Sequence, residues 1–310
     1  MRKSAFTLLE LIFVIVVIGI LSKYGIELLS QAYKNFIFSS VNNALQANSA
    51  AAVESIASRL QYRIKDSVIA REAGDFFGLA GYSADSAPIL EWVGADIDGF
   101  RGNTLTGGVF LPHWSGIIDL DASTAPATLV SPGTDTGALD TLINTLSNGG
   151  SDINDAALYF IGSDSDVKTG YGWDHATGAL TDQNVSVMHP INSVAGNPTQ
   201  FVSGIGGGDD FSGVNVYEYY QLAWTAYAVG ISNYDATTKT GTLMLYYDYQ
   251  PWKGDTYLQK ADGTQTKSAV IMDDVSTFQF KAVGSIVKIQ VCVNSDLMED
   301  YSLCKEKTIF

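Results

Sequence analysis

Residues 1–29 read MRKSAFTLLELIFVIVVIGILSKYGIELL, and this stretch decides the fold of the chain. A short basic head is followed by a run, 5–21, that is apolar except for Thr7 and Glu10. As a helix, residues 6–21 would be roughly 24 Å long, which nearly matches a hydrocarbon core of about 30 Å. Because positive charges stay on the cytoplasmic side, we expect the head to remain inside and the bulk of the chain to cross the membrane.

Three kinds of apolar N-terminus compete here: a cleaved secretory signal, a lipoprotein signal and a plain membrane anchor. The sequence SKYGIELL at 22–29 offers no A-x-A-like cleavage site, and a lipoprotein signal needs a cysteine that this stretch lacks. A plain anchor has to accommodate Glu10, and a carboxylate inside a spanning helix costs roughly 2.5–3.5 kcal/mol on insertion scales. Glu10 is therefore a candidate functional residue.

The sequence SAFTLLEL at 4–11 resembles the processing and assembly motif of type IV prepilins and type II secretion pseudopilins. The resemblance is confined to the basic head and the apolar run. It implies that a prepilin peptidase removes a leader, 1–5, by cutting between Ala5 and Phe6 on the cytoplasmic side, and that it methylates the new amino group of Phe6. The family usually has Gly before the cut. Alanine is the smallest alternative, so we expect cleavage here as well.

By the same resemblance, Glu10 becomes the fifth residue of the mature chain and acts in assembly. The implied fold is α+β and pilin-like, with a long N-terminal helix packed on an antiparallel sheet. The implied function is that of a structural, minor subunit of a pilus or pseudopilus, held in the bacterial inner membrane with its C-terminal domain in the periplasm. The implied partners are the peptidase, the membrane and other pilin-like subunits, reached through the N-terminal helix. No enzyme activity and no cofactor are implied.

The helix is expected to continue beyond the membrane. Apolar residues recur at three- and four-residue steps through 26–71, and the first proline of the chain is Pro88. We expect the helix to run from about residue 7 to residue 71, and we assign 6–25 to its membrane-spanning half and 26–71 to its amphipathic half. A stretch rich in Asn, Ser and Ala leaves a second arrangement open, in which a hinge near 46–51 separates two helices.

Two regions follow the helix. Residues 72–215 are rich in Gly, Asp, Ser and Asn, and we interpret them as a large, loop-rich β insertion with short apolar strands. Residues 216–310 alternate apolar and polar side chains in runs separated by NYDATTKTG at 233–241 and by Gly-Ser at 284–285. This pattern predicts an antiparallel sheet, with a last strand at 304–310, packed against the amphipathic half of the helix.

Two cysteines, Cys292 and Cys304, lie near the C-terminus. Beyond the membrane the compartment is oxidising, so we expect a disulfide between them, worth roughly 3 kcal/mol in the chain-entropy model. It would resemble, in minimal form, the C-terminal disulfide loop of many pilins. The alternative is a pair of free, buried thiols.

The net charge and the motifs of the sequence limit which activities the chain can be expected to have. With 33 Asp and Glu against 18 Lys and Arg, the formal net charge is −15, which argues against nucleic-acid binding. The sequence motifs of zinc peptidases, α/β-hydrolases, dinucleotide-binding folds and phosphate-binding loops do not occur. His113, His175 and His189 lie far apart beside aromatic residues or proline, and we interpret them as loop or rim residues. A membrane-anchored hydrolase with a carboxylate pair stays open, because spatial pairing is invisible in a sequence.

Two further hypotheses concern ligands. Asp164 and Asp166 offer oxygen ligands for calcium, but the sequence around them lacks the rest of a helical-hand calcium loop, so we favour a solvated acidic surface. The alternative to a purely structural subunit is an adhesive or ligand-binding module at the tip of a pilus. Its candidate surface is a group of aromatic side chains on two neighbouring predicted strands. These are Tyr217, Tyr219, Tyr220, Trp224, Tyr246, Tyr247, Tyr249 and Trp252.

Overall fold

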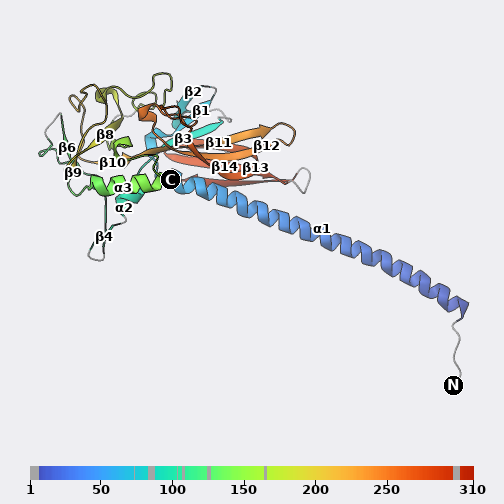
Figure 1. Cartoon of the computed structure of the whole chain (residues 1–310). Helices are drawn as coiled ribbons and strands as arrows, with labels where there is room; N and C mark the ends of the chain where they lie inside the picture. The colour runs from blue at the N-terminus through green and yellow to red at the C-terminus, as the bar shows by residue number, and fades with distance from the viewer. Residues whose placement is uncertain are drawn as a thin grey trace.

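The fold is α+β: one long N-terminal helix leaves a globular part that is built on antiparallel sheets (Figure 1). It is seen in a computed structural model, which describes residues 7–72, 74–82, 88–102, 104–106, 109–123, 127–163, 166–295 and 301–310.

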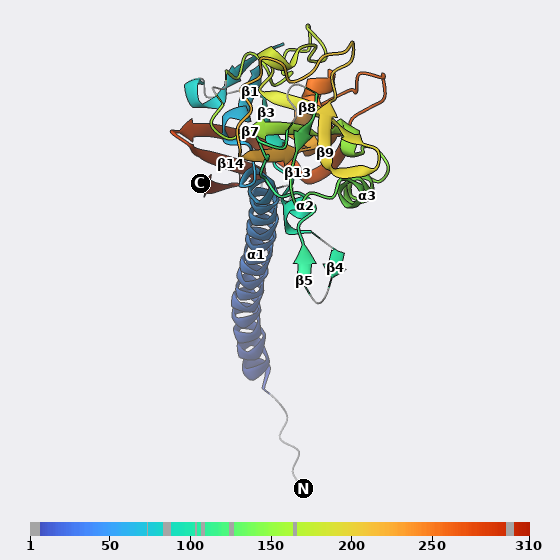
Figure 2. The ribbon, with the colours of Figure 1, turned by 90° about the vertical axis from the view of Figure 1, so that its left-hand side faces the viewer.

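Helix α1 (Leu8–Leu60) is continuous over 53 residues. It runs unbroken through the Asn- and Ala-rich stretch, so the alternative of a hinge near 46–51 is wrong. Its final turns bury small and branched side chains against the globular part, from Ser49 through Ile56 to Leu60. These turns lie across β13 (Lys267–Val283), β14 (Ile286–Asn294) and β15 (Ser302–Ile309). The rest of α1 extends away from the globular part as a gently curved rod (Figure 2).

The helix ends at Leu60 rather than at Arg71 as predicted. After Leu60 the chain turns, and the Ile64 N–H donates to the Val93 carbonyl at 2.9 Å, which ties the turn to the sheet. Ile69–Glu72 then form strand β1. The apolar residues that follow Leu60 are the buried side chains of a turn and a strand. Over so short a stretch, the spacing of apolar residues does not distinguish these elements from a helix.

Eight of the described strands form the main sheet, in the order β15-β14-β13-β12-β11-β3-β1-β2, with every neighbouring pair antiparallel. Their bounds are β1 (Ile69–Glu72), β2 (Asp75–Gly78), β3 (Ile89–Gly94), β11 (Thr225–Asp235), β12 (Thr240–Tyr249), β13 (Lys267–Val283), β14 (Ile286–Asn294) and β15 (Ser302–Ile309).

A second antiparallel sheet has the order β10-β7-β8-β9-β6. Its strands are β6 (Leu129–Val130), β7 (Ala157–Phe160), β8 (Met188–Val194), β9 (Asn197–Ser203) and β10 (Tyr220–Ala223). The remaining named elements are the hairpin β4 (Thr104–Thr106) and β5 (Val109–Leu111), the helices α2 (Ile97–Arg101) and α3 (Thr136–Leu146), and short 3-10 turns at Lys65–Ser67, Leu79–Gly81, Ile153–Asp155, Gln183–Val185 and Pro251–Lys253.

The predicted division at residues 215 and 216 does not separate the two sheets. Strand β3, from the predicted insertion, lies inside the main sheet between β1 and β11, whereas β10, from the predicted C-terminal sheet, pairs with β7 in the second sheet. The chain passes from β10 directly into β11 at Trp224. One extended segment therefore belongs to both sheets, and alternation of side chains along it gives no sign of the change of partner.

The predicted hairpins and last strand agree with the structure. Strands β11 and β12 pair across the turn that follows Asp235, and β13 and β14 pair across Gly284, whose φ of +62° suits glycine. The apolar face of β14 is buried, and β15 covers nearly the whole predicted last strand. The alternation of apolar and polar residues was sufficient to predict these strands because one face of each strand is buried and the other is not.

Candidate functional site

The described part of α1 begins with a capping box. The Thr7 hydroxyl accepts the Glu10 N–H at 3.4 Å, and Glu10 Oε2 accepts the Thr7 N–H at 3.0 Å and the Thr7 hydroxyl at 2.9 Å. The Glu10 carboxylate is thus folded back over the first turn, where it also faces the positive end of the helix dipole. Ala5 and Phe6, the predicted cleavage pair, lie outside the described residues.

Large apolar side chains of α1 are exposed along most of its length, from Leu8 (77% exposed) to Phe38 (45% exposed). This segment is about 46 Å long, whereas a hydrocarbon core is about 30 Å thick. Among the described helices, α1 is the one long and apolar enough to cross a membrane. Beyond residue 25, where the predicted membrane-spanning half ends, the exposed apolar side chains include Ile26, Leu28, Leu29, Tyr33, Phe36 and Phe38.

Part of the apolar surface beyond residue 25 points away from the globular part. Leu29 precedes Ile56 by 27 residues, which is about 7.5 turns, so the two lie on opposite sides of the helix. Tyr33 and Phe36 fall within about 40° of Leu29 at 100° per residue. Because Ile56 is fully buried against the sheet, the face that carries Leu29 points away from the protein's own globular part. The charged residues Lys23, Glu27 and Lys34 make no ion pair with any described residue.

The two cysteines face each other across β14 and β15. Cys292 and Cys304 are directly opposed in the strand register, and their sulfur atoms lie at disulfide-bonding distance, 2.06 Å. The pair therefore connects the last strand of the chain to its neighbour in the main sheet, and the alternative of two free thiols is not what the structure has.

The described residues do not form the calcium site that the sequence suggested. Asp164 lies outside the described residues, and Asp166 Oδ1 accepts the Lys168 N–H at 2.9 Å within a turn. Among the residues that are described, no group of three or more His, Cys, Asp or Glu side chains is placed to hold a metal ion.

The predicted aromatic surface is mostly core. Tyr220, Trp224, Tyr249 and Trp252 are each less than 9% exposed, and Tyr246 and Tyr247 are half-buried. The two that remain exposed are Tyr217 (37%) and Tyr219 (54%). The aromatic side chains therefore pack the interior, and they do not form the broad surface that an adhesive module was expected to present.

The interpretation of the histidines as loop or rim residues is wrong for His189, which lies in β8 (Met188–Val194) and is 4% exposed; His113 lies in a loop as predicted but is buried, at 2% exposed. His189 packs on Phe160 with ring centroids 4.9 Å apart, and its Nδ1 lies 2.9 Å from Gln183 Oε1. Gln183 uses its amide group to donate to the Pro190 carbonyl and the Ser203 hydroxyl, so its Oε1 is an acceptor and His189 Nδ1 carries the proton. Burial lowers the pKa of His189 to about 4.

This low pKa predicts acid sensitivity. Between about pH 6.5 and 4 the unfolded chain binds a proton at His189 and the folded chain does not, so the free energy of unfolding falls as the pH is lowered. From pH 7 to 4.5 the loss due to this group is about 2–3 kcal/mol. We expect His189→Asn to reduce the decline by that amount in denaturant titrations at the two pH values. An equal decline in both proteins would contradict the prediction.

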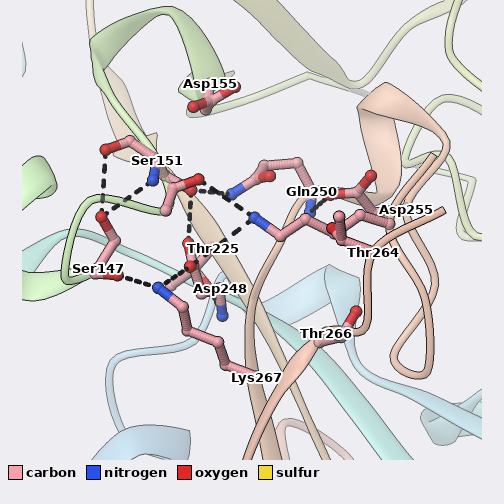
Figure 3. Close-up of polar contacts among 12 residues, drawn as sticks. Ser147, Ser151, Asp155, Thr225, Asp248, Gln250, Asp255, Thr264, Thr266 and Lys267 are labelled. Atoms are coloured by element: carbon pink, nitrogen blue, oxygen red, sulfur yellow. Dashed lines mark hydrogen bonds and ion pairs between the residues drawn. The ribbon is translucent and has the colours of Figure 1, made fainter. Parts of the chain in front are cut away.

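A buried carboxylate, Asp248 of β12, organises a polar cluster with the loop that follows α3 (Figure 3). Its Oδ2 lies 2.8 Å from Lys267 Nζ, Ser151 donates its hydroxyl to Oδ1, and the Asp248 N–H donates to Thr225 Oγ1 at 2.9 Å. Gly150 is required beside it, because a Cβ there would lie 2.1 Å from Asp248 Oδ2. The partners of the carboxylate are all supplied by the chain itself, so this cluster is a structural junction.

A second buried charge lies between the sheets. Glu91 of β3 is fully buried and forms an ion pair with Arg71 of β1. The Tyr249 hydroxyl donates to Glu91 Oε2 at 3.0 Å, and Arg71 Nη2 donates to the Trp173 carbonyl at 3.1 Å. Burial raises the pKa of Glu91, while Arg71 opposes that rise. The group joins the main sheet to the loop that carries Trp173.

Asp96 is a third buried acid, in a pocket of about 330 Å³ between the end of α1 and α2. Burial raises its pKa to about 6. Both of its oxygens are occupied, because Oδ1 accepts the Gly99 N–H and Oδ2 accepts the Trp114 indole N–H, each at 3.1 Å. The geometry is that of an N-cap of α2. The predictions from sequence had missed Asp96, Asp248 and the Arg71–Glu91 pair.

Comparison of the chain with protein-family models, with curated proteins and with solved structures finds no match in any of the three. The functional argument therefore depends on the N-terminal sequence and on the geometry of α1.

Proposed function

We propose that the chain is a structural, prepilin-like subunit that is assembled through α1 into a type IV pilus or a type II secretion pseudopilus as a minor component. The observation that supports this most directly is the length of exposed apolar helix. A plain membrane anchor explains about 30 Å of apolar surface, but the exposed apolar part of α1 is about 46 Å long. The remaining surface needs protein partners.

The direction of the exposed face supports the same proposal. Leu29, Tyr33 and Phe36 lie on the side of α1 opposite the globular part, so neighbouring helices can cover them without displacing the sheets. Packing of several such helices side by side would bury this face and leave the globular parts outside. Other pilin-like subunits, presenting helices of the same kind, are the proposed partners.

The proposed location is the bacterial inner membrane, followed by the filament. The basic head favours a cytoplasmic N-terminus and a single pass, which leaves the globular part in the periplasm. A disulfide at Cys292 and Cys304 suits that oxidising compartment. The prepilin peptidase is the enzyme proposed to act on the chain, between Ala5 and Phe6.

The processing step provides the test. We expect mass spectrometry of the purified subunit to find an N-terminal peptide that begins with N-methylated Phe6. Ala5→Gly, which introduces the residue usual in the family, should be processed at least as completely, whereas Ala5→Leu should retain the leader because a bulky side chain does not fit a pocket built for glycine. An intact N-terminus in the parent, or one that begins beyond Leu21, would reject the proposal.

A further inference from the structure

The end of the chain touches α1 well outside the region where the helix is buried. Tyr301, the residue just before β15, packs its ring against Phe38 with centroids 5.4 Å apart and an interplanar angle of 62°. Its hydroxyl donates to Asn42 Oδ1 at 2.8 Å. The first fully buried side chain of α1 is Ser49, about two turns further along the helix. Tyr301 is therefore an outlying contact, separate from the core.

Little else supports the helix between these two points. From 43 to 48 the side chains are exposed, apart from the half-buried Leu45. A groove of about 420 Å³ separates this part of α1 from the ends of β13 and β14. The stretch is also rich in Asn, Ser and Ala, which contribute little packing of their own. Without Tyr301, the first contact of the helix with the core would be the half-buried Leu45, and full burial would begin at Ser49.

Tyr301 is itself held by the β14–β15 pair. Its carbonyl accepts the Ser295 N–H at 2.9 Å, which extends the pairing of the two strands by one residue on each side. The next residues pair in register, and three positions after Tyr301 the disulfide joins Cys304 to Cys292. Among the described strands, β15 pairs with β14 alone, so the disulfide fixes an edge strand that otherwise depends on one neighbour.

A third contact aligns the strand with the helix. Lys307 forms an ion pair with Glu54, so β15 touches α1 at Phe38 through Tyr301 and again at Glu54 through Lys307. The separation is about 24 Å along the helix and about 20 Å along the strand, which means that the two run side by side in the same direction.

We infer that Tyr301, positioned by the Cys292–Cys304 disulfide, is a clamp that sets where α1 becomes free of the globular part. With the clamp in place the helix is held from Phe38 onward. When the clamp is removed, the point of release moves toward Ser49 and the intervening turns open more often. The clamp acts on the direction and stiffness of the projecting helix, and it is independent of what that helix binds.

Hydrogen exchange on the full-length protein in detergent micelles tests the clamp. Tyr301→Ala and the double variant Cys292→Ser/Cys304→Ser should each raise the exchange rate of amides in 36–48 by about tenfold, because an aromatic contact and a hydrogen bond are lost together. Tyr301→Phe keeps the ring and should give a smaller increase. Peptides from 52–60, which are packed on the sheet, should be unchanged.

Two comparisons make the test decisive. Tyr234→Ala removes an exposed tyrosine from β11 and should leave 36–48 at the parent rate. Chemical reduction of the parent protein should reproduce the double cysteine variant without any mutation. Unchanged exchange at 36–48 in Tyr301→Ala, or an equal rise at 52–60, would overturn the clamp, since the first shows no local support and the second shows a general loss of stability.

Discussion

Replacing Arg71 by methionine should lower the free energy of unfolding by about 3–5 kcal/mol, because it leaves Glu91 buried without its cation. Glu91 is fully buried, and the Tyr249 hydroxyl alone does not compensate a carboxylate in that environment. The measurement is a denaturant titration of the full-length protein in micelles at pH 7, followed by tryptophan fluorescence. The steepness of the transition should stay the same, since the folded and unfolded states keep their surface areas.

Two variants separate the charge from the packing. In Arg71→Met/Glu91→Gln the buried group is neutral and still bonds Tyr249, so about half of the lost free energy should return. Lys168→Met removes a cation from the ion pair with Asp75, in which both side chains are largely exposed, and should cost less than about 1 kcal/mol. If the single and double variants at the buried pair were equally unstable, the loss would come from packing and not from the unpaired charge.

Under the proposed function, replacing Glu10 by valine should reduce incorporation into filaments by at least about tenfold, with membrane insertion and processing intact. In an assembly the proposed partner of Glu10 is the new amino group of Phe6 on an adjacent subunit, and methylation leaves that amine cationic. The residues are four apart, about 6 Å of axial rise, so a neighbour shifted by that distance brings the two charges level. Helices that are otherwise apolar have little else to fix their alignment in lipid.

The capping box supplies a sharper variant. Glu10→Gln retains a side chain that can close the box with Thr7 but removes the charge. If the charge sets the alignment, Glu10→Gln should fail like Glu10→Val. If Glu10 serves the helix only as a cap, Glu10→Gln should enter filaments as the parent does, and the proposed pairing is then wrong. Glu27→Val removes an exposed carboxylate from the same helix and is the control for loss of charge alone.

Local patterns predicted the elements of this fold well where one face alone is buried. The β13–β14 hairpin and the buried face of β14 follow from the period of the apolar residues and from Gly284, whereas the start of α1, which is exposed on all sides, follows from its apolar run. The opposition of Cys292 and Cys304 was expected from compartment and family resemblance. The patterns failed at Leu60 and at Trp224, where the fold depends on which distant strand the chain meets.

The buried charges were missed for a related reason. Glu91 lies in the strand sequence ILEWVG, and Asp248 follows three apolar or aromatic positions in LYYDY, so each is a single acid inside an apolar strand. That pattern was a usable signal of a buried charge. The partners of these two acids, Arg71 for Glu91 and Lys267 for Asp248, are brought to them by strand pairing within the main sheet, and no local spacing reveals them.

The side-by-side course of α1 and β15 has a mechanical consequence. Under the proposed function, a subunit that is pulled by its N-terminal helix would transmit the tension to the strand that runs along that helix, and from there to β14. Because the load is parallel to the strands, the hydrogen bonds between β14 and β15 are sheared together and share the force; a load across the strands would break them one after another. The Cys292–Cys304 bond also connects β14 and β15. A covalent link therefore reinforces the hydrogen bonds between the two strands through which the tension would reach the sheet.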